Sequence, residues 1–256
     1  MKTVTVISRK GGAGKTTVSL NLALAAKQAG LRAMIADIDP LQSAATIVGA
    51  RPEAPSFLFE TKAAKLFVLQ DACRKNGCDL LIVDTPTGPE PDVVMAMNFA
   101  DLCVIVTRPT TLDVAAIRES IGLVQRANCP GLIVLNQCPP HRRGEETVGV
   151  QRAIEQLLFS RLPVATTRLR SRTAYQDAFA HGLGVTEWDL ACDGATDVLR
   201  LLAEISDKLS LPLRAKPAPK PMRSAPTSLP VHILQRALRA HGLPAGTRIN
   251  GVSIGD

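Results

Sequence analysis

Short apolar runs bounded by turn residues recur along the chain, and they constrain its fold more than any other sequence feature. Five runs stand out: Thr3–Ile7, Arg32–Ala36, Asp79–Val83, Leu102–Val106 and Gly131–Leu135. They do not alternate apolar with polar residues, which is typical of strands buried on both faces. Longer segments of helical periodicity separate them. The sequence therefore predicts an α/β fold, a predominantly parallel twisted sheet with helices on both faces.

Positive charge is concentrated at the C-terminal end. Of the net charge of +7, residues 1–211 contribute +1 (23 Lys and Arg against 22 Asp and Glu), and residues 212–256 contribute +6 (7 against 1). Proline and basic residues dominate the stretch after Leu209. We expect an α/β domain in residues 1–210, a basic proline-rich linker in 211–230, and a short helix and tail in 231–256.

The predicted C-terminal helix between Pro230 and Gly242 is amphipathic. It is short and lacks Trp and Phe, which argues against lipid binding and favours docking on its own domain or on a partner. The sequence has no apolar stretch of 18 residues, no leader pattern and no metal-ligand spacing among its six cysteines. We expect a cytoplasmic protein with reduced thiols.

The loop after the first apolar run, SRKGGAGKTT in residues 8–17, has the composition of a phosphate-binding loop. Its glycines allow successive N–H groups to turn toward an anion, and the following helix adds its positive end. Lys15 would neutralise the β and γ phosphates, and the Thr16 hydroxyl would bind Mg²⁺. The residues expected to contact the nucleotide are Lys10, Gly11, Gly12, Ala13, Gly14, Lys15, Thr16 and Thr17.

Acidic residues end two further strands. Asp84 follows the run Asp79–Val83, where a carboxylate is costly unless it meets a cation or water. We expect it to face the hydration shell of Mg²⁺. Asp37 and Asp39 follow the second run in the same way.

The loop resembles the deviant Walker A motif of the ParA/MinD superfamily of ATPases. Other motifs are similar too: DIDPLQSA (Asp37–Ala44) resembles the switch I segment, and LLIVDTPTG (Leu80–Gly88) resembles Walker B with switch II. RTAYQDAFAHGLGVTEW (Arg172–Trp188) is similar to a stretch of small plasmid-partition ParA proteins. The resemblance covers residues 1 to about 209 and implies a P-loop NTPase fold.

The resemblance implies roles for individual residues. Lys10 would reach the phosphates bound by the other subunit of an ATP-sandwich homodimer, which makes hydrolysis depend on dimerisation. Asp39 would orient the attacking water and contact Mg²⁺ indirectly, and Asn136 would recognise the adenine edge. Gln42 follows Leu41 here, whereas the family's glutamine follows the proline directly.

The resemblance also implies partners. ParA proteins bind non-specific DNA and are stimulated by a ParB-like centromere-binding protein, so Arg168, Arg170 and Arg172 are the expected DNA contacts of a nucleoid-associated protein that segregates a plasmid or chromosome. Three alternatives stay open: a relative that positions a non-DNA cargo such as a chemotaxis, conjugation or secretion assembly, a MinD-like membrane-surface regulator, and a metabolic P-loop enzyme of the dethiobiotin-synthetase type, which would not need Lys10.

Overall fold

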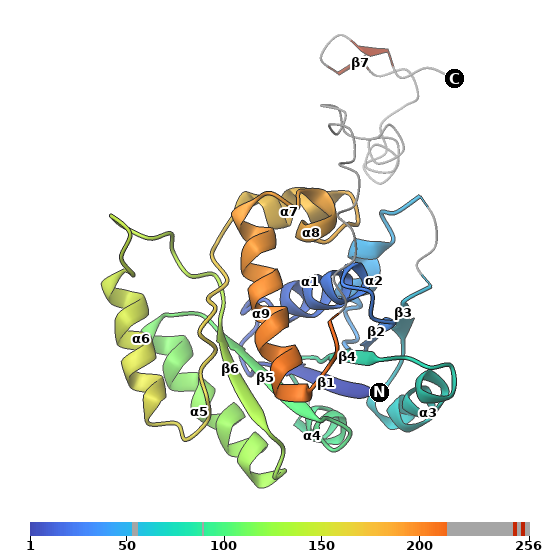
Figure 1. Ribbon diagram of the computed structural model, residues 1–256, viewed down its shortest axis with the longest axis horizontal. Coiled ribbons are helices and arrows are strands. Elements are labelled where there is room, and N and C mark those ends of the chain that lie inside the picture. Colours follow the sequence, from blue (N-terminus) through green and yellow to red (C-terminus); the bar gives the residue numbers. More distant parts are fainter. Residues whose placement is uncertain (53–55, 89, 214–247, 250–251, 254–256) are drawn as a thin grey trace. The chain divides into compact units, whose positions relative to one another are not determined.

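The computed structural model describes residues 1–52, 56–88, 90–213, 248–249 and 252–253. Within the first 213 residues, a parallel sheet of six strands has the order β3-β2-β4-β1-β5-β6 (Figure 1). The strands are β1 (Lys2–Ile7), β2 (Ala33–Asp37), β3 (Leu58–Glu60), β4 (Leu80–Asp84), β5 (Leu102–Thr107) and β6 (Gly131–Leu135). The predicted α/β fold is confirmed.

The five predicted strands are present, with ends shifted by no more than one residue. The sequence analysis missed β3, which has only three residues and pairs with β2 alone, from Ile35↔Leu58 to Asp37↔Glu60. Such a short edge strand carries little hydrophobic pattern of its own. It extends the sheet by one strand beyond β2.

Helices connect the strands, as parallel pairing requires. They are α1 (Lys15–Gln28), α2 (Ser43–Val48), the 3₁₀ turn η1 (Ala63–Lys65), α3 (Leu66–Lys75), α4 (Glu90–Met97), α5 (Thr111–Arg126), α6 (Val148–Leu158), α7 (Thr173–Ala180), α8 (Val185–Trp188) and α9 (Asp193–Leu209). The predicted helices after the phosphate loop and before residue 210 correspond to α1 and α9.

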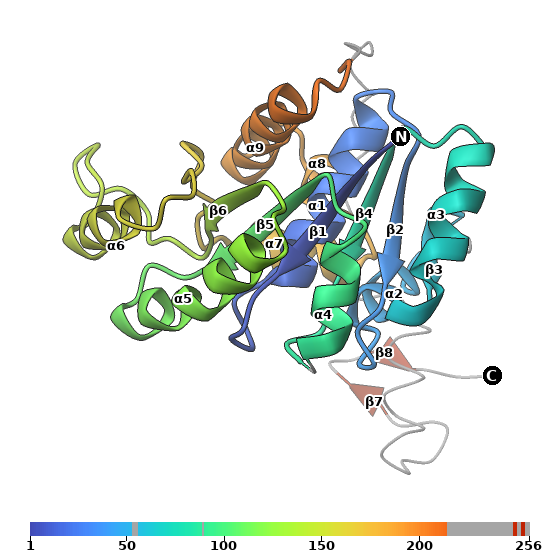
Figure 2. The same cartoon turned by 90° about the horizontal axis from the view of Figure 1, so that it is seen from below.

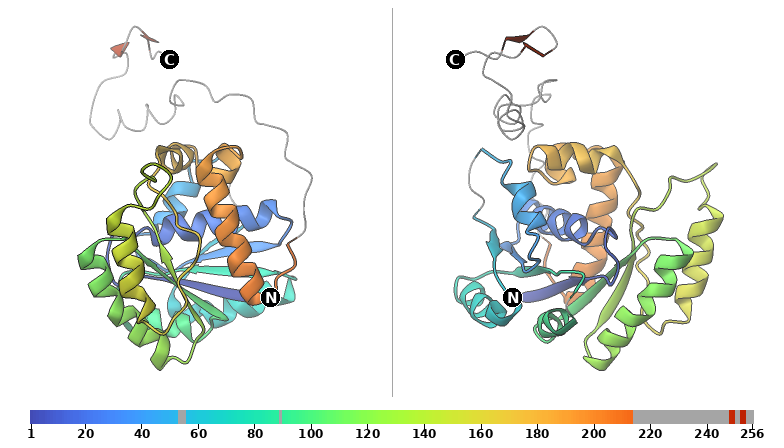
Figure 3. Two further views of the ribbon diagram at one scale, coloured as in Figure 1. Left: turned by 60° about the vertical axis from the view of Figure 1, so that its left-hand side comes forward. Right: turned by 180° about the vertical axis from the view of Figure 1, so that it is seen from behind.

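Two layers of helices bury the two faces of the sheet. Helices α1 and α9 pack on one face, against alternate strand residues such as Val4 and Val104. Helices α3, α4 and α5 cover the other face, where Ile105 and Val83 point, and α6 packs beside α5 (Figures 2 and 3). Strands covered on both faces explain the unbroken apolar runs in the sequence.

The strand register brings the acidic residues together at the carboxyl edge of the sheet. Asp37 at the end of β2 is the register partner of Asp84 at the end of β4, and Val6 of β1 pairs with Asp84 on its other side. The phosphate loop leaves β1 at this edge. Ligands of open α/β sheets bind at this edge.

The chain divides into two units, Met1–Pro219 and Lys220–Asp256. The described residues of the second unit make a small antiparallel pair, β7 (Arg248–Ile249) with β8 (Val252–Ser253). Most of the predicted linker in 211–230 and the predicted helix in 231–241 lie outside the described residues. Among the helices that the structure describes, none has the length and apolar character needed to cross a bilayer.

Candidate nucleotide-binding site

The phosphate loop connects β1 to α1 through two glycines with positive φ. Gly12 has φ 73° and Gly14 has φ 92°, in the left-handed region that disfavours other residues. A Cβ on Gly14 would also lie 2.1 Å from Nδ2 of Asn136, whereas Cβ atoms on Gly11 and Gly12 would meet nothing within 4 Å. The loop is thus closed on the Asn136 side and has open space beside Gly11 and Gly12.

Lys15 is the first residue of α1 and is buried. Its Nζ donates to Thr87 Oγ1 at 3.1 Å, in the segment after β4. Burial lowers the pKa of Lys15, and the nearby carboxylates of Asp84 and Asp39 oppose that change. A buried ammonium at the first turn of a helix is suited to an anionic ligand. Thr17 follows on α1 and is half-buried.

Asp84 is completely buried and lies among hydroxyl groups. Thr16 Oγ1 donates to one of its oxygens at 2.7 Å, and Ser19 Oγ donates to the other at 3.0 Å. Burial raises the pKa of Asp84 to about 7, although the Thr16 bond acts in the opposite direction. A hydroxyl next to a carboxylate is the oxygen donor set that Mg²⁺ prefers, so Thr16 and Asp84 fit the predicted ion.

Asp37 holds the switch I segment in place. One of its oxygens accepts the N–H of Asp39 at 3.1 Å, and the other accepts the N–H groups of Ala44 and Ala45 at 3.1 and 3.3 Å. Burial raises the pKa of Asp37, while these backbone bonds favour its charged form. Asp39 is only partly buried and accepts the N–H of Leu41 at 3.0 Å. Asp39 is therefore the more accessible of the two carboxylates.

Lys10 contacts a helix of its own chain. Its Nζ lies 3.2 Å from Oδ1 of Asp113, in the first turn of α5. The Asp113 side chain is 2% exposed and also accepts bonds from Arg108 Nε at 2.7 Å and Thr110 Oγ1 at 2.8 Å. Burial acts to raise the pKa of Asp113, but the bonds from Arg108, Thr110 and Lys10 together outweigh burial and lower this pKa. The sequence analysis missed Asp113.

Two side chains after β6 brace the phosphate loop. Asn136 Nδ2 donates to the carbonyl oxygen of Ala13 at 2.8 Å, and Gln137 Nε2 donates to that of Gly12 at 2.8 Å. Asn136 is buried. The structure thus brings Asn136 to the site, in contact with the loop backbone. Its contact with an adenine edge stays a prediction. The sequence analysis did not identify Gln137.

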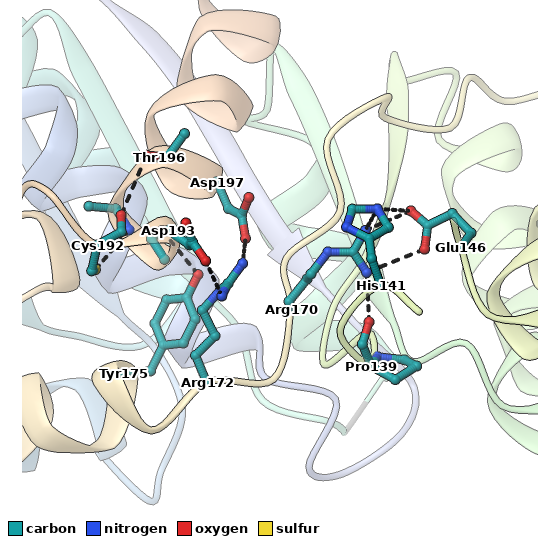
Figure 4. A network of polar contacts seen from close by, with 12 residues as sticks. Pro139, His141, Glu146, Arg170, Arg172, Tyr175, Cys192, Asp193, Thr196 and Asp197 are labelled. Atoms are coloured by element: carbon teal, nitrogen blue, oxygen red, sulfur yellow. Dashed lines mark hydrogen bonds and ion pairs between the residues drawn. The ribbon is translucent and has the colours of Figure 1, made fainter. Parts of the chain in front are cut away.

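The three arginines expected to contact DNA are engaged with other residues of the chain. Arg170 is the most enclosed, with a side chain 7% exposed. It donates to both oxygens of Glu146, at 2.7 and 3.3 Å, and to the carbonyl oxygen of Pro139 at 2.6 Å, and it contacts His141 (Figure 4). Burial and these contacts count against a direct contact between Arg170 and a phosphate.

Arg168 and Arg172 are more exposed but also have acidic neighbours. Arg168 Nε lies 3.6 Å from a Glu146 oxygen. Arg172 donates to Asp193 at 2.8 Å and to Asp197 at 3.4 Å (Figure 4). The three arginines therefore do not form one open basic face in this structure. For Arg168 and Arg172 a DNA contact stays a prediction.

Comparisons with known proteins identify the family. The family described as "CobQ/CobB/MinD/ParA nucleotide binding domain" matches residues 4–216. The chain belongs to the ParA/MinD superfamily of ATPases. ATP and Mg²⁺ are the cofactors of this superfamily.

Individual relatives agree with this assignment. "Maintenance of carboxysome distribution protein A" of Gloeobacter kilaueensis is 32% identical over 196 residues, which cover 73% of this chain and 85% of the relative. Two of the similar solved structures, both with a TM-score of 0.66, illustrate the match. The ATP complex of a McdA variant from Cyanothece is 16% identical and covers 84% of this chain and 99% of its own. MinD with Mg-ADP from Pyrococcus horikoshii is 19% identical, and the match covers 82% of this chain and 97% of the MinD chain. At these identities the structures show the ParA/MinD fold.

Proposed function

We propose that this chain is a positioning ATPase that closes as a dimer on two ATP molecules. The observation that carries the proposal is the second lysine of the loop. Lys15 is directed at Thr87, whereas Lys10 lies at Asp113 and has no contact with Thr87 or Asp84 among the described residues. A lysine that its own site does not use is available to a neighbouring subunit, where it would stabilise the charge of phosphoryl transfer.

The other residues of the site have complementary tasks. Lys15 and the N–H groups of the loop bind the phosphates. Thr16 and Asp84 hold Mg²⁺, which supplies neutralising positive charge to the phosphate oxygens when bound. Asp37 anchors the switch I segment so that Asp39 orients a water molecule. Positioning of this kind suits slow hydrolysis.

The Lys10→Ala variant tests the proposal. It should bind ATP as the unmodified chain does, yet hydrolyse it about a hundredfold more slowly, because only the contribution across the dimer is lost. Arg9→Ala is the matched control, since Arg9 pairs with Glu90 and Glu119 on the surface. Full turnover by Lys10→Ala would contradict the proposal and favour a metabolic P-loop enzyme.

For the cargo, we propose a protein assembly distributed over non-specific DNA in the cytoplasm, with a partner protein that stimulates hydrolysis. Similarity to a carboxysome distribution protein over most of both chains supports this choice. In the source cells, loss of the chain should cluster one type of assembly and leave plasmid retention unchanged.

Segregation of a plasmid or chromosome with a ParB-like partner is the second candidate function. The stretch Arg172–Trp188 favours it, because it is similar to a stretch of plasmid-partition ParA proteins. Plasmid loss from cells that lack the chain, with every protein assembly still evenly spaced, would support this candidate over the first.

For the DNA surface, we propose four arginines that are at least partly exposed: Arg142, Arg143, Arg168 and Arg172. Arg142 and Arg143 lie exposed on the turn that precedes Glu146, and Arg168 Nε lies 3.6 Å from a Glu146 oxygen. Replacing Arg142, Arg143, Arg168 and Arg172 by alanine should weaken DNA binding in the ATP state and flatten its salt dependence. The control is Arg74→Ala, at an exposed position on α3. An unchanged salt slope in an electrophoretic shift assay would place the surface elsewhere.

A further inference from the structure

A groove between α5 and α6 lies outside the nucleotide site. It has a volume of about 990 Å³. Its apolar lining comes from Val114, Ile117 and Ile121 of α5 and from Leu157 and Phe159 at the end of α6. All its lining residues belong to the described part of the chain.

Large apolar side chains are exposed at one end of this groove. Phe159, which follows the last residue of α6, is 88% exposed, and the preceding Leu158 is 69% exposed. The packing of α6 does not need them, because its buried face consists of Val150, Ala153 and Leu157. Two adjacent exposed apolar side chains beside an apolar groove are typical of a contact site for another protein.

The charges around the groove indicate what chemistry fits it. Arg118 and Arg161 line it together with a single acidic residue, Glu155. None of these three side chains lies within ion-pair distance of an opposite charge in the described residues. The excess of unpaired positive charge favours an acidic occupant. The chain's own C-terminal segment with Arg236 and Arg239 is basic and fits poorly.

We propose that the α5–α6 groove docks an acidic amphipathic helix of a partner protein. The apolar side chains of that helix would enter the groove and cover Phe159, and its Asp and Glu residues would meet Arg118 and Arg161. From Thr111 to Gln125 the lining of α5 extends about 21 Å at 1.5 Å per residue, the length of a helix of about 14 residues.

One wall of the groove is α5, the helix whose Asp113 pairs with Lys10. Ile117 lines both this groove and a small cavity formed with Lys10 and Asp113. A bound helix would pack against the first turns of α5, and in this respect the inference deepens the proposed function by locating a partner. Docking itself is measured without nucleotide, so its failure is distinguishable from failure of the proposed ATPase activity.

Two fluorescein-labelled helical peptides of 16 residues test the docking. Both carry leucines at i, i+3, i+4 and i+7 spacing, with glutamates flanking the leucines in one and lysines in the other. Fluorescence anisotropy with the full chain should show at least tenfold tighter binding of the glutamate peptide, and binding that weakens as salt rises. Equal binding of the two peptides, or absence of binding up to 1 mM, would overturn the proposal.

Surface variants of the full chain complete the test. Phe159→Ser should weaken glutamate-peptide binding at least tenfold, and Arg118→Glu with Arg161→Glu should reverse the preference toward the lysine peptide. Circular dichroism checks the fold of each variant, and Arg74→Glu is the matched charge control on α3. Unchanged binding by the folded variants would contradict the proposal.

Occupation of the groove by the chain itself is measured separately. Leu234→Asp with Leu238→Asp in the full chain should leave peptide affinity unchanged. A tenfold gain in affinity would show that the chain's own C-terminal segment covers the groove and would overturn the proposal of an external partner. A Phe159-dependent dimer in sedimentation without nucleotide would overturn it in favour of a second copy.

Discussion

The phosphate loop and the arginine segment of residues 168–172 both bring several charged residues together, but their charges are arranged differently. In the arginine segment, Arg170 and Arg172 donate to carboxylates of Glu146 and Asp193. At the phosphate loop, Lys15 contacts a hydroxyl and no carboxylate lies within ion-pair distance in the described residues. The buried cation Lys15, which has no carboxylate partner and lies beside the open side of the loop, indicates a ligand site, whereas the enclosed pair of Arg170 with Glu146 indicates a structural role.

Lys15→Ala tests the first half of this comparison and should have the largest effect. ATP affinity should fall about a thousandfold or more, equivalent to about 4 kcal/mol, because the loop loses its buried cation. Calorimetric titration with ATP and Mg²⁺ measures the loss. Lys75→Ala is the control, since Lys75 is an exposed lysine paired with Asp71 on α3. ATP affinity that survives in Lys15→Ala would remove the assignment of the loop.

Asp84, beside the phosphate loop, should make the stability of the fold depend on pH. Its pKa is about 7 in the folded chain against 3.8 for an unperturbed carboxyl group. Between these values the folded chain holds a proton that the unfolded chain has released, so the free energy of unfolding should fall as pH rises from about 4 to about 7. The loss should approach about 4 kcal/mol, because each unit of difference between the folded and unfolded pKa is worth about 1.4 kcal/mol.

Urea unfolding without nucleotide or Mg²⁺, at pH 5, 6, 7 and 8, measures this dependence. Other groups titrate as well, so the quantity of interest is the difference between the unmodified chain and Asp84→Asn, which keeps the shape of the side chain but has no carboxyl proton. Parallel stability curves for the two proteins would show that Asp84 is ionised throughout this range.

Arg170 tests the second half of the comparison. Arg170→Met removes the cation that faces Glu146 and should destabilise the fold by about 3 kcal/mol, since a largely enclosed carboxylate loses its main partner. Arg168→Ala should cost less than about 1 kcal/mol, because Arg168 is more exposed and its contact with Glu146 is longer. Urea unfolding compares the two variants.

The double variant Glu146→Gln with Arg170→Met isolates the ion pair. It should recover much of the stability that Arg170→Met loses, because no unpaired carboxylate remains. If Arg170→Met were instead fully stable and lost DNA binding alone, Arg170 would be a DNA contact and the contrast between the two regions would disappear.

Asp113→Asn should have the smallest effect. The Lys10–Asp113 pair is partly exposed and is worth at most about 1 kcal/mol, so releasing Lys10 should lower the concentration for ATP-dependent dimerisation about fivefold. Arg108→Ala is the control, because it removes the other cation beside Asp113 and leaves Lys10 in place. An identical shift in both variants would show that the effect arises from α5 and not from Lys10.

The sequence predicted the parts of this molecule whose pattern is local. Unbroken apolar runs predicted the five strands that the structure contains. The glycine spacing of the loop after β1 predicted a phosphate-binding role for Lys15 and a Mg²⁺-binding role for Thr16, and these roles stay predictions. The strand β3 was missed because three residues at a sheet edge carry almost no periodicity.

Contacts between distant segments could not be predicted in this way. Asp113 meets Lys10, and Gln137 meets Gly12 across 125 positions. The alternation of Arg168, Arg170 and Arg172 resembles an exposed basic strand, but the loop that carries Glu146 folds over Arg170. Only the tertiary structure shows which of these cations already has a partner.

The central claim is that two copies of the chain enclose two ATP molecules and exchange their Lys10 side chains. Sedimentation velocity of the full chain with Mg²⁺ and a non-hydrolysable ATP analogue tests it most directly, with ADP and Lys15→Ala as controls. The account predicts a dimer with the analogue and a monomer in both controls. A monomer that persists at saturating analogue would contradict it.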